Sequence, residues 1–164
     1  MSNGTKVKKR DGRIEPLDLD KMHLMVEEAC QGLAGVSASQ VEMKSGIQFY
    51  DGITTEEIQE ILIRAASDLI DLDHPNYQFV AARLLLFALR KQLYGKMRDL
   101  PSLEDHIYSC VNAEVYDPEI YSKYSLEEIQ KADTYIDHTR DFMFTYAGLR
   151  QVADKYLVQD RSKR

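Results

Sequence analysis

Four cationic side chains lie close together near the start of the chain, at Lys8, Lys9, Arg10 and Arg13. Asp18 follows them, and aspartate is typical of the position that caps the N-terminus of a helix. Helix N-termini offer free N–H groups and the positive end of the helix dipole, so cations beside one suit the binding of a polyphosphate. The alternative is a solvated basic hairpin on the surface, and these residues alone leave both interpretations open.

The element that carries these cations is predicted to be a β-hairpin. Asp11-Gly12 lies between short segments that contain Val7 and Ile14, which is typical of a two-residue turn. A type I′ turn needs positive φ at both central positions; glycine adopts it freely and aspartate tolerates it. Pro16 has no N–H to donate, so strand pairing is expected to end there.

Charge is distributed unevenly along the chain. Residues 1–13 contain five Lys/Arg and one Asp, a local net charge of +4, whereas the whole chain carries −6. The remaining residues therefore carry −10. A general nucleic-acid-binding protein needs a broad basic face, so this class is disfavoured. An acidic body with one basic hairpin fits a small anionic ligand bound at one end.

Cysteine content and hydropathy exclude several other classes. Cys30 and Cys110 are eighty residues apart, with no C-x-x-C pair and no neighbouring histidine pair. This pattern gives neither a zinc ribbon nor a disulfide framework, and it predicts buried thiols in a reducing cytosol. The N-terminus lacks an apolar signal segment, and no run of eighteen apolar residues occurs. We therefore expect a cytoplasmic protein without a membrane partner.

Amphipathic periodicity predicts four helices after the hairpin. The first two cover about residues 19–32 and 37–50. The third runs from a capping box at residues 54–57 to a stop at residues 73–75, and the fourth covers about residues 76–96. The fourth has the widest apolar arc, so we expect it to be buried centrally among the others.

A composition shift at residues 97–102 marks a boundary, and shorter helices follow it. They are expected to begin after Ser102, after Ser125 and near Thr145. Seven of the ten tyrosines follow residue 100. Tyrosine is suited to a surface with one apolar and one wet side. We therefore interpret residues 100–164 as a layer that packs against another part of a protein.

Seven short motifs in order make a specific resemblance. They are V-K-K-R-D-G at 7–12, L-D-K at 19–21, Q-F-Y-D-G-I at 48–53, A-A-R-L at 81–84, Y-G at 94–95, I-D-H-T-R-D at 136–141 and K-Y-L-V-Q at 155–159. In these motifs the chain resembles the N-terminal part of the large subunit of class I ribonucleotide reductase. They span nearly the whole chain, whereas K-R-D-G alone would be weak.

The resemblance implies a mainly α fold in two parts. Residues 1–97 would form an ATP-cone, a regulatory domain made of an N-terminal β-hairpin and a four-helix bundle. Residues 98–164 would be a helical segment that leads into the catalytic barrel. In that family, ATP in the cone keeps the enzyme active and dATP shuts it off, and we expect magnesium to accompany the nucleotide.

The resemblance also supplies a candidate nucleotide site. The matching positions are Lys9, Glu15, Pro16, Leu17, Asp18, Leu19, Asp20, Lys21, Thr55 and Lys91. Lys9 and Lys91 are long cations suited to phosphates, Thr55 offers a hydroxyl, and Glu15 and Asp18 can accept from base or ribose donors. Each also has a structural alternative: Lys91 complements a helix dipole, Thr55 begins a helix, and Glu15 ends a strand.

Two positions depart from the family. Gln59 and Ala88 stand where relatives often have histidines near this pocket, so the preference between ATP and dATP is left open. No catalytic residue is predicted, because the family's reaction needs cysteines of the barrel and of a C-terminal redox pair, and Cys30 and Cys110 match neither. Asp137-His138 beside Arg140-Asp141 lacks a nucleophile and is interpreted as a hydrogen-bonded structural cluster.

Three functional hypotheses remain. The chain is the N-terminal portion of a reductase large subunit, a free-standing nucleotide sensor, or a helical interaction protein without a ligand. A transcriptional repressor with an ATP-cone would carry a four-cysteine zinc ribbon, which this sequence lacks. Under the first hypothesis the partners are the remainder of the large subunit and the radical-generating small subunit. Residues 36–44, with Ser39, Glu42 and Met43 facing outward, are the candidate surface for the small subunit.

Overall fold

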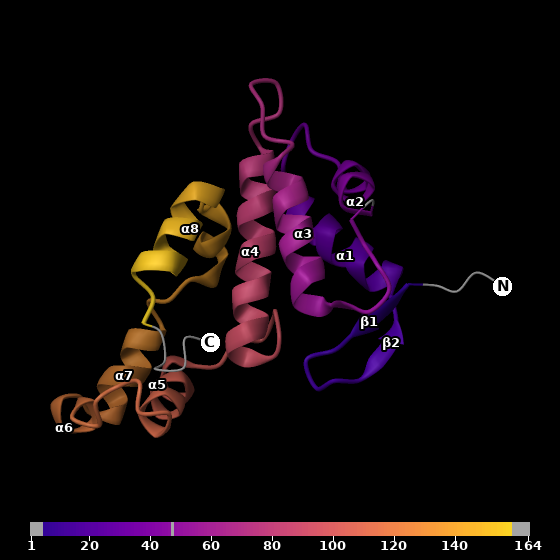
Figure 1. Cartoon of the computed structure of the whole chain (residues 1–164). Coiled ribbons are helices and arrows are strands. Elements are labelled where there is room, and N and C mark those ends of the chain that lie inside the picture. Colours follow the sequence, from indigo (N-terminus) through magenta and orange to yellow (C-terminus); the bar gives the residue numbers. More distant parts are fainter. Residues whose placement is uncertain (1–4, 47, 159–164) are drawn as a thin grey trace.

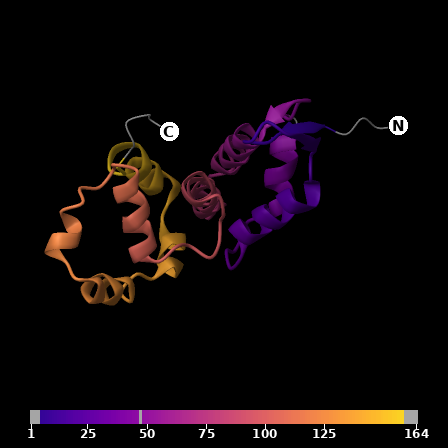
Figure 2. The same cartoon turned by 90° about the horizontal axis from the view of Figure 1, so that it is seen from below.

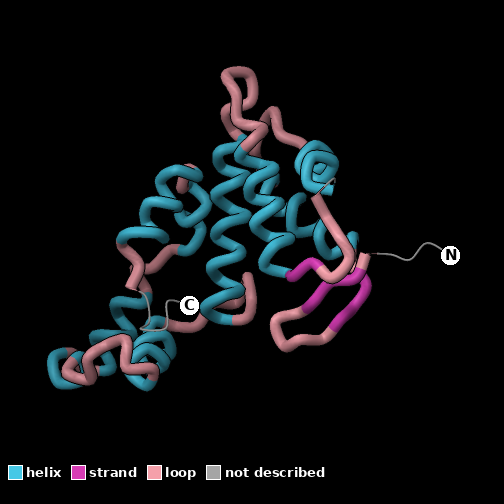
Figure 3. Tube along the Cα trace, in the orientation of Figure 1, coloured by secondary structure: helices cyan, strands magenta, loops and turns pink. Residues whose placement is uncertain are grey.

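The computed structural model describes residues 5–46 and 48–158 of the chain. The fold is mainly helical, with a small sheet at one end (Figure 3). Gln159 of the last motif and both ends of the expected two-part division lie outside the described residues. Among the described residues, no helix combines the length and the apolar character that crossing a membrane requires.

The hairpin is present, but its turn differs from the predicted one. Strands β1 (Lys6–Lys8) and β2 (Ile14–Pro16) are antiparallel, with Val7 opposite Glu15. Lys9 N donates to Arg13 O at 2.8 Å and Gly12 N donates to Lys9 O at 2.9 Å, which closes a three-residue loop. Within this loop only Gly12 has positive φ, at 86°, and Asp11 does not. The two-residue type I′ prediction was wrong, because a turn ending in one left-handed glycine closes the hairpin.

A third strand, which the sequence did not predict, completes the sheet. β3 (Ile53–Thr54) pairs in parallel with β1, with Val7 opposite Ile53, so the strand order is β2-β1-β3. Gly52, with φ 86°, turns the chain into β3, and its N–H donates to Lys6 O at 2.9 Å. Two residues show no alternation, and Thr54 is at once the cap of the next helix, so periodicity could not reveal this strand.

Four helices of the first part follow the sheet in the predicted order. They are α1 (Leu19–Cys30), α2 (Ala38–Gly46), α3 (Thr55–Ser67) and α4 (Tyr77–Tyr94). Asp18 caps α1, and its carboxylate accepts from Lys21 N at 2.9 Å. The capping box of α3 is also confirmed: Thr54 Oγ1 accepts from Glu57 N, and the Glu57 carboxylate accepts from Thr54 N. Helix α2 ends four residues before the predicted Tyr50.

Helices α3 and α4 form the centre of the molecule (Figure 1). Helices α1 and α2 lie on one side of this pair, and the sheet lies at the end where α3 begins. The residues of α4 that are buried are mostly apolar: Tyr77, Val80, Ala81, Ala82, Leu84, Leu85 and Phe87, together with Arg90. The expectation that this helix is buried centrally is confirmed.

The remaining elements lie on the other face of α4 and below it (Figures 1 and 2). They are α5 (Leu103–Asn112), α6 (Ile120–Lys123), α7 (Leu126–Asp133), the 3-10 helix η1 (His138–Met143) and α8 (Tyr146–Lys155). Ser102 and Ser125 cap their helices as predicted, and α8, which was expected to begin near Thr145, is capped by that residue.

Helix α8 packs directly on the first part of the chain. Leu149 of α8 is buried in the same hydrophobic core as the residues of α4, and Phe142 of η1 packs against that core. Leu149 and Phe142 are therefore covered within the chain itself, whereas Met143 of η1 is 72% exposed. The division into residues 1–97 and 98–164 remains a proposal.

Candidate functional site

A pocket of about 100 Å³ opens between the hairpin, the start of α1, the start of α3 and the end of α4. Six of its lining residues are apolar side chains, which we call its apolar floor: Val7, Leu17, Met22, Met25, Ile58 and Met97. Lys9, Lys21 and Lys91 stand among its other lining residues. An apolar floor beside several cations suits a ligand with a flat apolar ring at one end and phosphates at the other.

Among the residues that line the pocket, Lys91 has a lowered pKa. Its burial and the nearby positive charges of Lys21, Lys9 and Arg10 lower the pKa of its ammonium group below the ordinary lysine value, while Glu56 opposes them. Three cations of the hairpin and α1 are thus close enough to Lys91 of α4 to repel its ammonium group. Like charges held together in this way are stabilised when an anion binds between them.

Arg10 connects the hairpin loop to helices α3 and α4 beside the pocket. Its guanidinium pairs with the Glu56 carboxylate and donates to Lys91 O at 3.0 Å. One side chain of the hairpin loop therefore contacts both α3 and α4. Because the contacts on Arg10 are already made within the protein, its main role here is to hold Lys9 and the hairpin in place.

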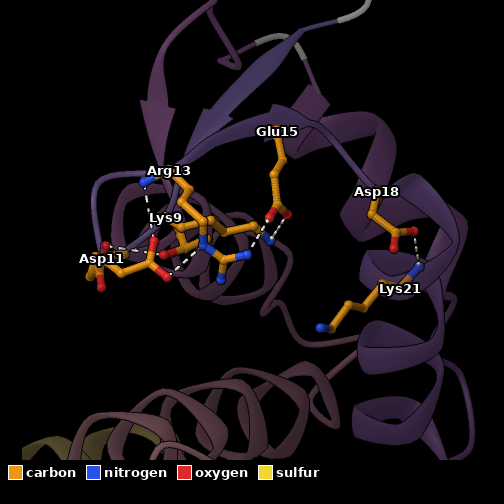
Figure 4. Close-up of polar contacts among 8 residues, drawn as sticks. Lys9, Asp11, Arg13, Glu15, Asp18 and Lys21 are labelled. Atoms are coloured by element: carbon orange, nitrogen blue, oxygen red, sulfur yellow. Dashed lines mark hydrogen bonds and ion pairs between the residues drawn. The ribbon is translucent and has the colours of Figure 1, made fainter.

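Glu15 neutralises part of the hairpin's charge. Its carboxylate lies 3.4 Å from Lys9 Nζ and 3.1 Å from Arg13 Nη1. Figure 4 shows this cluster on the hairpin and Lys21 extending toward it from α1. A phosphate that reached Lys9 would compete with Glu15 for the ammonium group, so Glu15 lowers the charge that the hairpin presents to a ligand.

Thr55 is the first residue of α3 and lines the pocket half-buried. Its hydroxyl donates to Glu56 Oε2 at 3.2 Å. The capping box one residue earlier fixes the start of α3, so the hydroxyl stands at a helix N-terminus. The structural alternative for Thr55 and its proposed ligand contact are therefore compatible, since the same position serves both.

Gln59 lines the pocket with a side-chain amide whose nitrogen lacks a hydrogen-bond partner in the described part of the chain. Its side chain is buried, with 8% exposed, and among the described residues its Nε2 has no hydrogen-bond partner. A buried donor without an acceptor costs about 1–3 kcal/mol. Gln59 lies one helical turn after Thr55, so both face the same side of α3. A ligand acceptor in the pocket would satisfy it.

The structure brings together seven of the ten predicted positions as pocket lining: Lys9, Pro16, Leu17, Asp18, Lys21, Thr55 and Lys91. Glu15, Leu19 and Asp20 are not among the lining residues; Glu15 instead pairs with Lys9, and Leu19 is 59% exposed. The assignment of these residues to a nucleotide site is a prediction.

Sequence reasoning missed several lining residues. Gln59 was noted only as a departure, although its spacing from Thr55 could have placed it in the pocket. Met97 returns to the pocket because Gly95 adopts φ 70° and ends α4 with a reversal of the chain. Arg10 was visible in the K-K-R run, but its contacts with Glu56 and Lys91 O depend on the tertiary fold.

A larger groove of about 350 Å³ lies between α3, α4 and α8. Its two arginines are each paired with a glutamate: Arg10 with Glu56, and Arg150 with Glu60 at 2.7 Å. Paired cations attract a phosphate less than Lys21 and Lys91 of the smaller pocket, which form no ion pair among the described residues. The groove is larger than the pocket around Lys91, but charge favours that pocket as the anion site.

Similar proteins are known over nearly the whole length of this chain. The chain is 48% identical to ribonucleoside-diphosphate reductase 1 subunit alpha of Escherichia coli over 161 residues, which cover 98% of this chain and 21% of that protein. Identity is 48% to the subunit alpha of Haemophilus influenzae and 44% to that of Enterobacteria phage T4. The chain spans about a fifth of the length of these relatives, and the resemblance seen in its motifs is confirmed.

Every lining residue of the pocket except Met97 falls inside the part of the chain that matches a described domain. Residues 5–92 match the family described as the ATP cone domain. That segment contains the hairpin, helices α1 to α3, α4 as far as residue 92 and each predicted position of the site. It covers more than half of the described residues, and this chain therefore belongs to the ATP cone domain family.

Proposed function

We propose that this chain is the N-terminal regulatory part of a ribonucleoside-diphosphate reductase large subunit and binds ATP or dATP as an allosteric effector. The observation that carries the proposal is the group of Lys9, Lys21 and Lys91 around a pocket with an apolar floor. Membership of the ATP cone family supports an adenine nucleotide as the anion. The similarity to reductase subunits over 98% of the chain supports the regulatory context.

The residues of the pocket divide into two groups in this proposal. Lys9, Lys21 and Lys91 bind the phosphates, and Thr55 adds a hydroxyl at the start of α3. The apolar floor accepts the adenine ring, and Gln59 Nε2 donates to an acceptor of the nucleoside. Magnesium comes with the triphosphate as its counter-ion. Among the described residues, no group of three or more His, Cys, Asp or Glu is arranged to hold a metal.

The proposed partners follow from the length of the relatives. The remainder of the large subunit would cover the exposed apolar side chains of the second part, which include Tyr108, Tyr124, Tyr135, Met143 and Phe144. The radical-generating small subunit would meet the surface at residues 36–44, where Met43 is 70% exposed. Cys30 and Cys110 are free thiols, which supports a cytoplasmic location.

Isothermal titration calorimetry tests the proposal. We expect the folded chain to bind ATP or dATP with magnesium at micromolar affinity, and to bind inorganic tripolyphosphate more weakly because the apolar floor then stays empty. Lys9→Ala should weaken ATP binding about tenfold or more, since a hydrogen bond to a charged group contributes roughly 1.5–3 kcal/mol. No heat and no thermal shift with either nucleotide would refute the proposal.

A free-standing nucleotide sensor is the second candidate. The buried Leu149 favours it, because α8 already packs on the cone without a further chain. Light scattering separates the two: a sensor stays monomeric at high concentration, whereas an exposed docking layer that lacks its partner associates.

A further inference from the structure

Arg90 connects the nucleotide pocket to the second part of the chain. It lies on α4 next to Lys91 and is buried, with 8% exposed. Consecutive residues of a helix point about 100° apart, so Lys91 faces the pocket while Arg90 faces the elements beyond it. A buried arginine needs partners for its charge, and Arg90 finds them on two different segments.

The guanidinium of Arg90 donates hydrogen bonds through both of its terminal nitrogens, Nη1 and Nη2, which we call its two arms. Nη2 donates to Asp141 Oδ2 of η1 at 2.8 Å, and Nη1 donates to Met97 O at 3.4 Å. The Met97 side chain forms part of the pocket. The guanidinium is planar and rigid, so its two arms cannot move independently. A shift of the segment at Met97 is therefore passed to Asp141.

Asp141 and its neighbour dock η1 on α4. Asp141 Oδ2 also lies 3.1 Å from His138 Nδ1. The ring of Phe142 lies 5.7 Å from the Arg90 guanidinium carbon, and its centre is 6.1 Å from that of Phe87. These contacts hold η1, and with it the start of α8, on the face of α4 opposite α1. The contacts of Asp141 and Phe142 with the Arg90 guanidinium depend on where it lies, and Arg83 also lies over the Phe142 ring, 5.4 Å from its centre.

We propose that Arg90 is a positioning residue that couples nucleotide occupancy of the pocket to the docking of η1 and α8 on the cone. The inference rests on the proposed nucleotide function. Nucleotide bound against Met97 and Lys91 favours the position of Arg90 in which both arms are engaged, and η1 is then held more firmly. Coupling of this kind is reciprocal, so weakening the contact of Arg90 with η1 also weakens nucleotide binding.

Hydrogen exchange on the whole chain, with ATP binding measured by calorimetry on the same variants, tests the coupling. We expect saturating ATP to slow exchange at residues 138–143 of the wild type. Asp141→Asn removes the charge that Arg90 contacts, so ATP should no longer slow exchange there, and ATP should bind about fivefold or more weakly. Asp141→Glu restores the charge and should restore both effects.

Two further variants separate coupling from simple stability. Arg90→Lys keeps a buried cation for Asp141 but lacks the second arm to Met97 O, so it should keep the wild-type exchange rate without ATP and lose the slowing by ATP. Glu60→Gln breaks the ion pair with Arg150 of α8 and leaves Arg90 intact, so it should behave like the wild type. The Arg90→Lys result remains decisive even where Asp141→Asn fails to fold.

The outcomes that overturn the inference are distinct from failure of the proposed function. An absence of ATP binding to the wild type by calorimetry would refute both. ATP binding that leaves exchange at residues 138–143 unchanged would refute the coupling alone. Faster exchange in Asp141→Asn by the same factor with and without ATP, at wild-type affinity, would show a merely structural contact.

Discussion

Replacement of Lys91 by methionine should weaken nucleotide binding and leave the free protein at least as stable as the wild type. Methionine keeps most of the apolar length of the side chain and removes the charge. The pKa of Lys91 is lowered first by its burial and then by Lys21, Lys9 and Arg10. A pKa lowered by folding means that the protonated ammonium group opposes folding at neutral pH; this penalty decreases as pH rises through the folded-state pKa and is gone above the unfolded-state pKa. Loss of the charge therefore removes this free-energy penalty from the ligand-free protein.

The magnitude follows from the burial of Lys91. Two unit charges 4 Å apart near a protein surface attract by about 4 kcal/mol at an effective dielectric constant of 20. Part of this is lost to desolvation, because Lys91 is half-buried before the ligand arrives. A net contribution of roughly 1.5–3 kcal/mol remains for a hydrogen bond to a charged group. The dissociation constant for ATP should therefore rise about 10- to 150-fold.

Calorimetry with ATP and magnesium measures the affinity, and thermal unfolding without ligand measures stability. Lys96→Met is the matched control, because it removes one charge beyond the end of α4 at an exposed residue that does not line the pocket. The control should bind ATP within about twofold of the wild type. Lys91→Met that binds ATP as well as the control does, or that unfolds well below the wild type, would refute the reasoning.

Further expectations concern the pocket and the packing of α8. Gln59→Leu removes the buried donor that lacks a partner, so it should stabilise the free chain by about 1–3 kcal/mol in denaturant unfolding and weaken ATP binding by calorimetry. ATP affinity should fall with rising alkaline pH, because the lowered pKa of Lys91 lets it lose its proton before an ordinary lysine does; Lys91→Met should lose that part of the dependence. Leu149→Ala should lower the free energy of unfolding by roughly 2–5 kcal/mol and speed hydrogen exchange in α8, whereas unchanged stability would show that α8 is not part of the core.

Local signals in the sequence were sufficient to predict most of the helices. The caps at Asp18, Thr54, Ser102 and Ser125 each satisfy backbone N–H groups close in sequence, so a helix start can be recognised without knowledge of the rest of the fold. The wide apolar arc of α4 likewise indicated its central position. Mainly α architecture was therefore predictable from caps and periodicity.

Features that depend on contacts distant in sequence were not predictable in this way. Strand β3 exists because Ile53 pairs with Val7, forty-six residues earlier, and its two residues carry no pattern of their own. The hairpin turn was assigned incorrectly because Asp-Gly also occurs where glycine alone takes the left-handed conformation. Neither the orphaned amide of Gln59 nor the burial of Arg90 can be read from residue types.

The site was predictable in part, for a related reason. Lys9, Lys21 and Lys91 were named from the resemblance, and the pocket lining includes all three. The repulsion that Lys9 and Lys21 exert on Lys91, which we propose favours an anion in the pocket, depends on the hairpin, α1 and α4 meeting at one place. Sequence position alone could not separate Glu15, which pairs with Lys9, from the residues that line the pocket.

A crystal structure of the chain with ATP and magnesium tests the central claim most directly. The account predicts density for the triphosphate between the ammonium groups of Lys9, Lys21 and Lys91, with the adenine ring against Met22 and Met25 and the Gln59 amide satisfied. Nucleotide bound instead in the groove between α3, α4 and α8, with the three lysines contacting only solvent and protein, would contradict it.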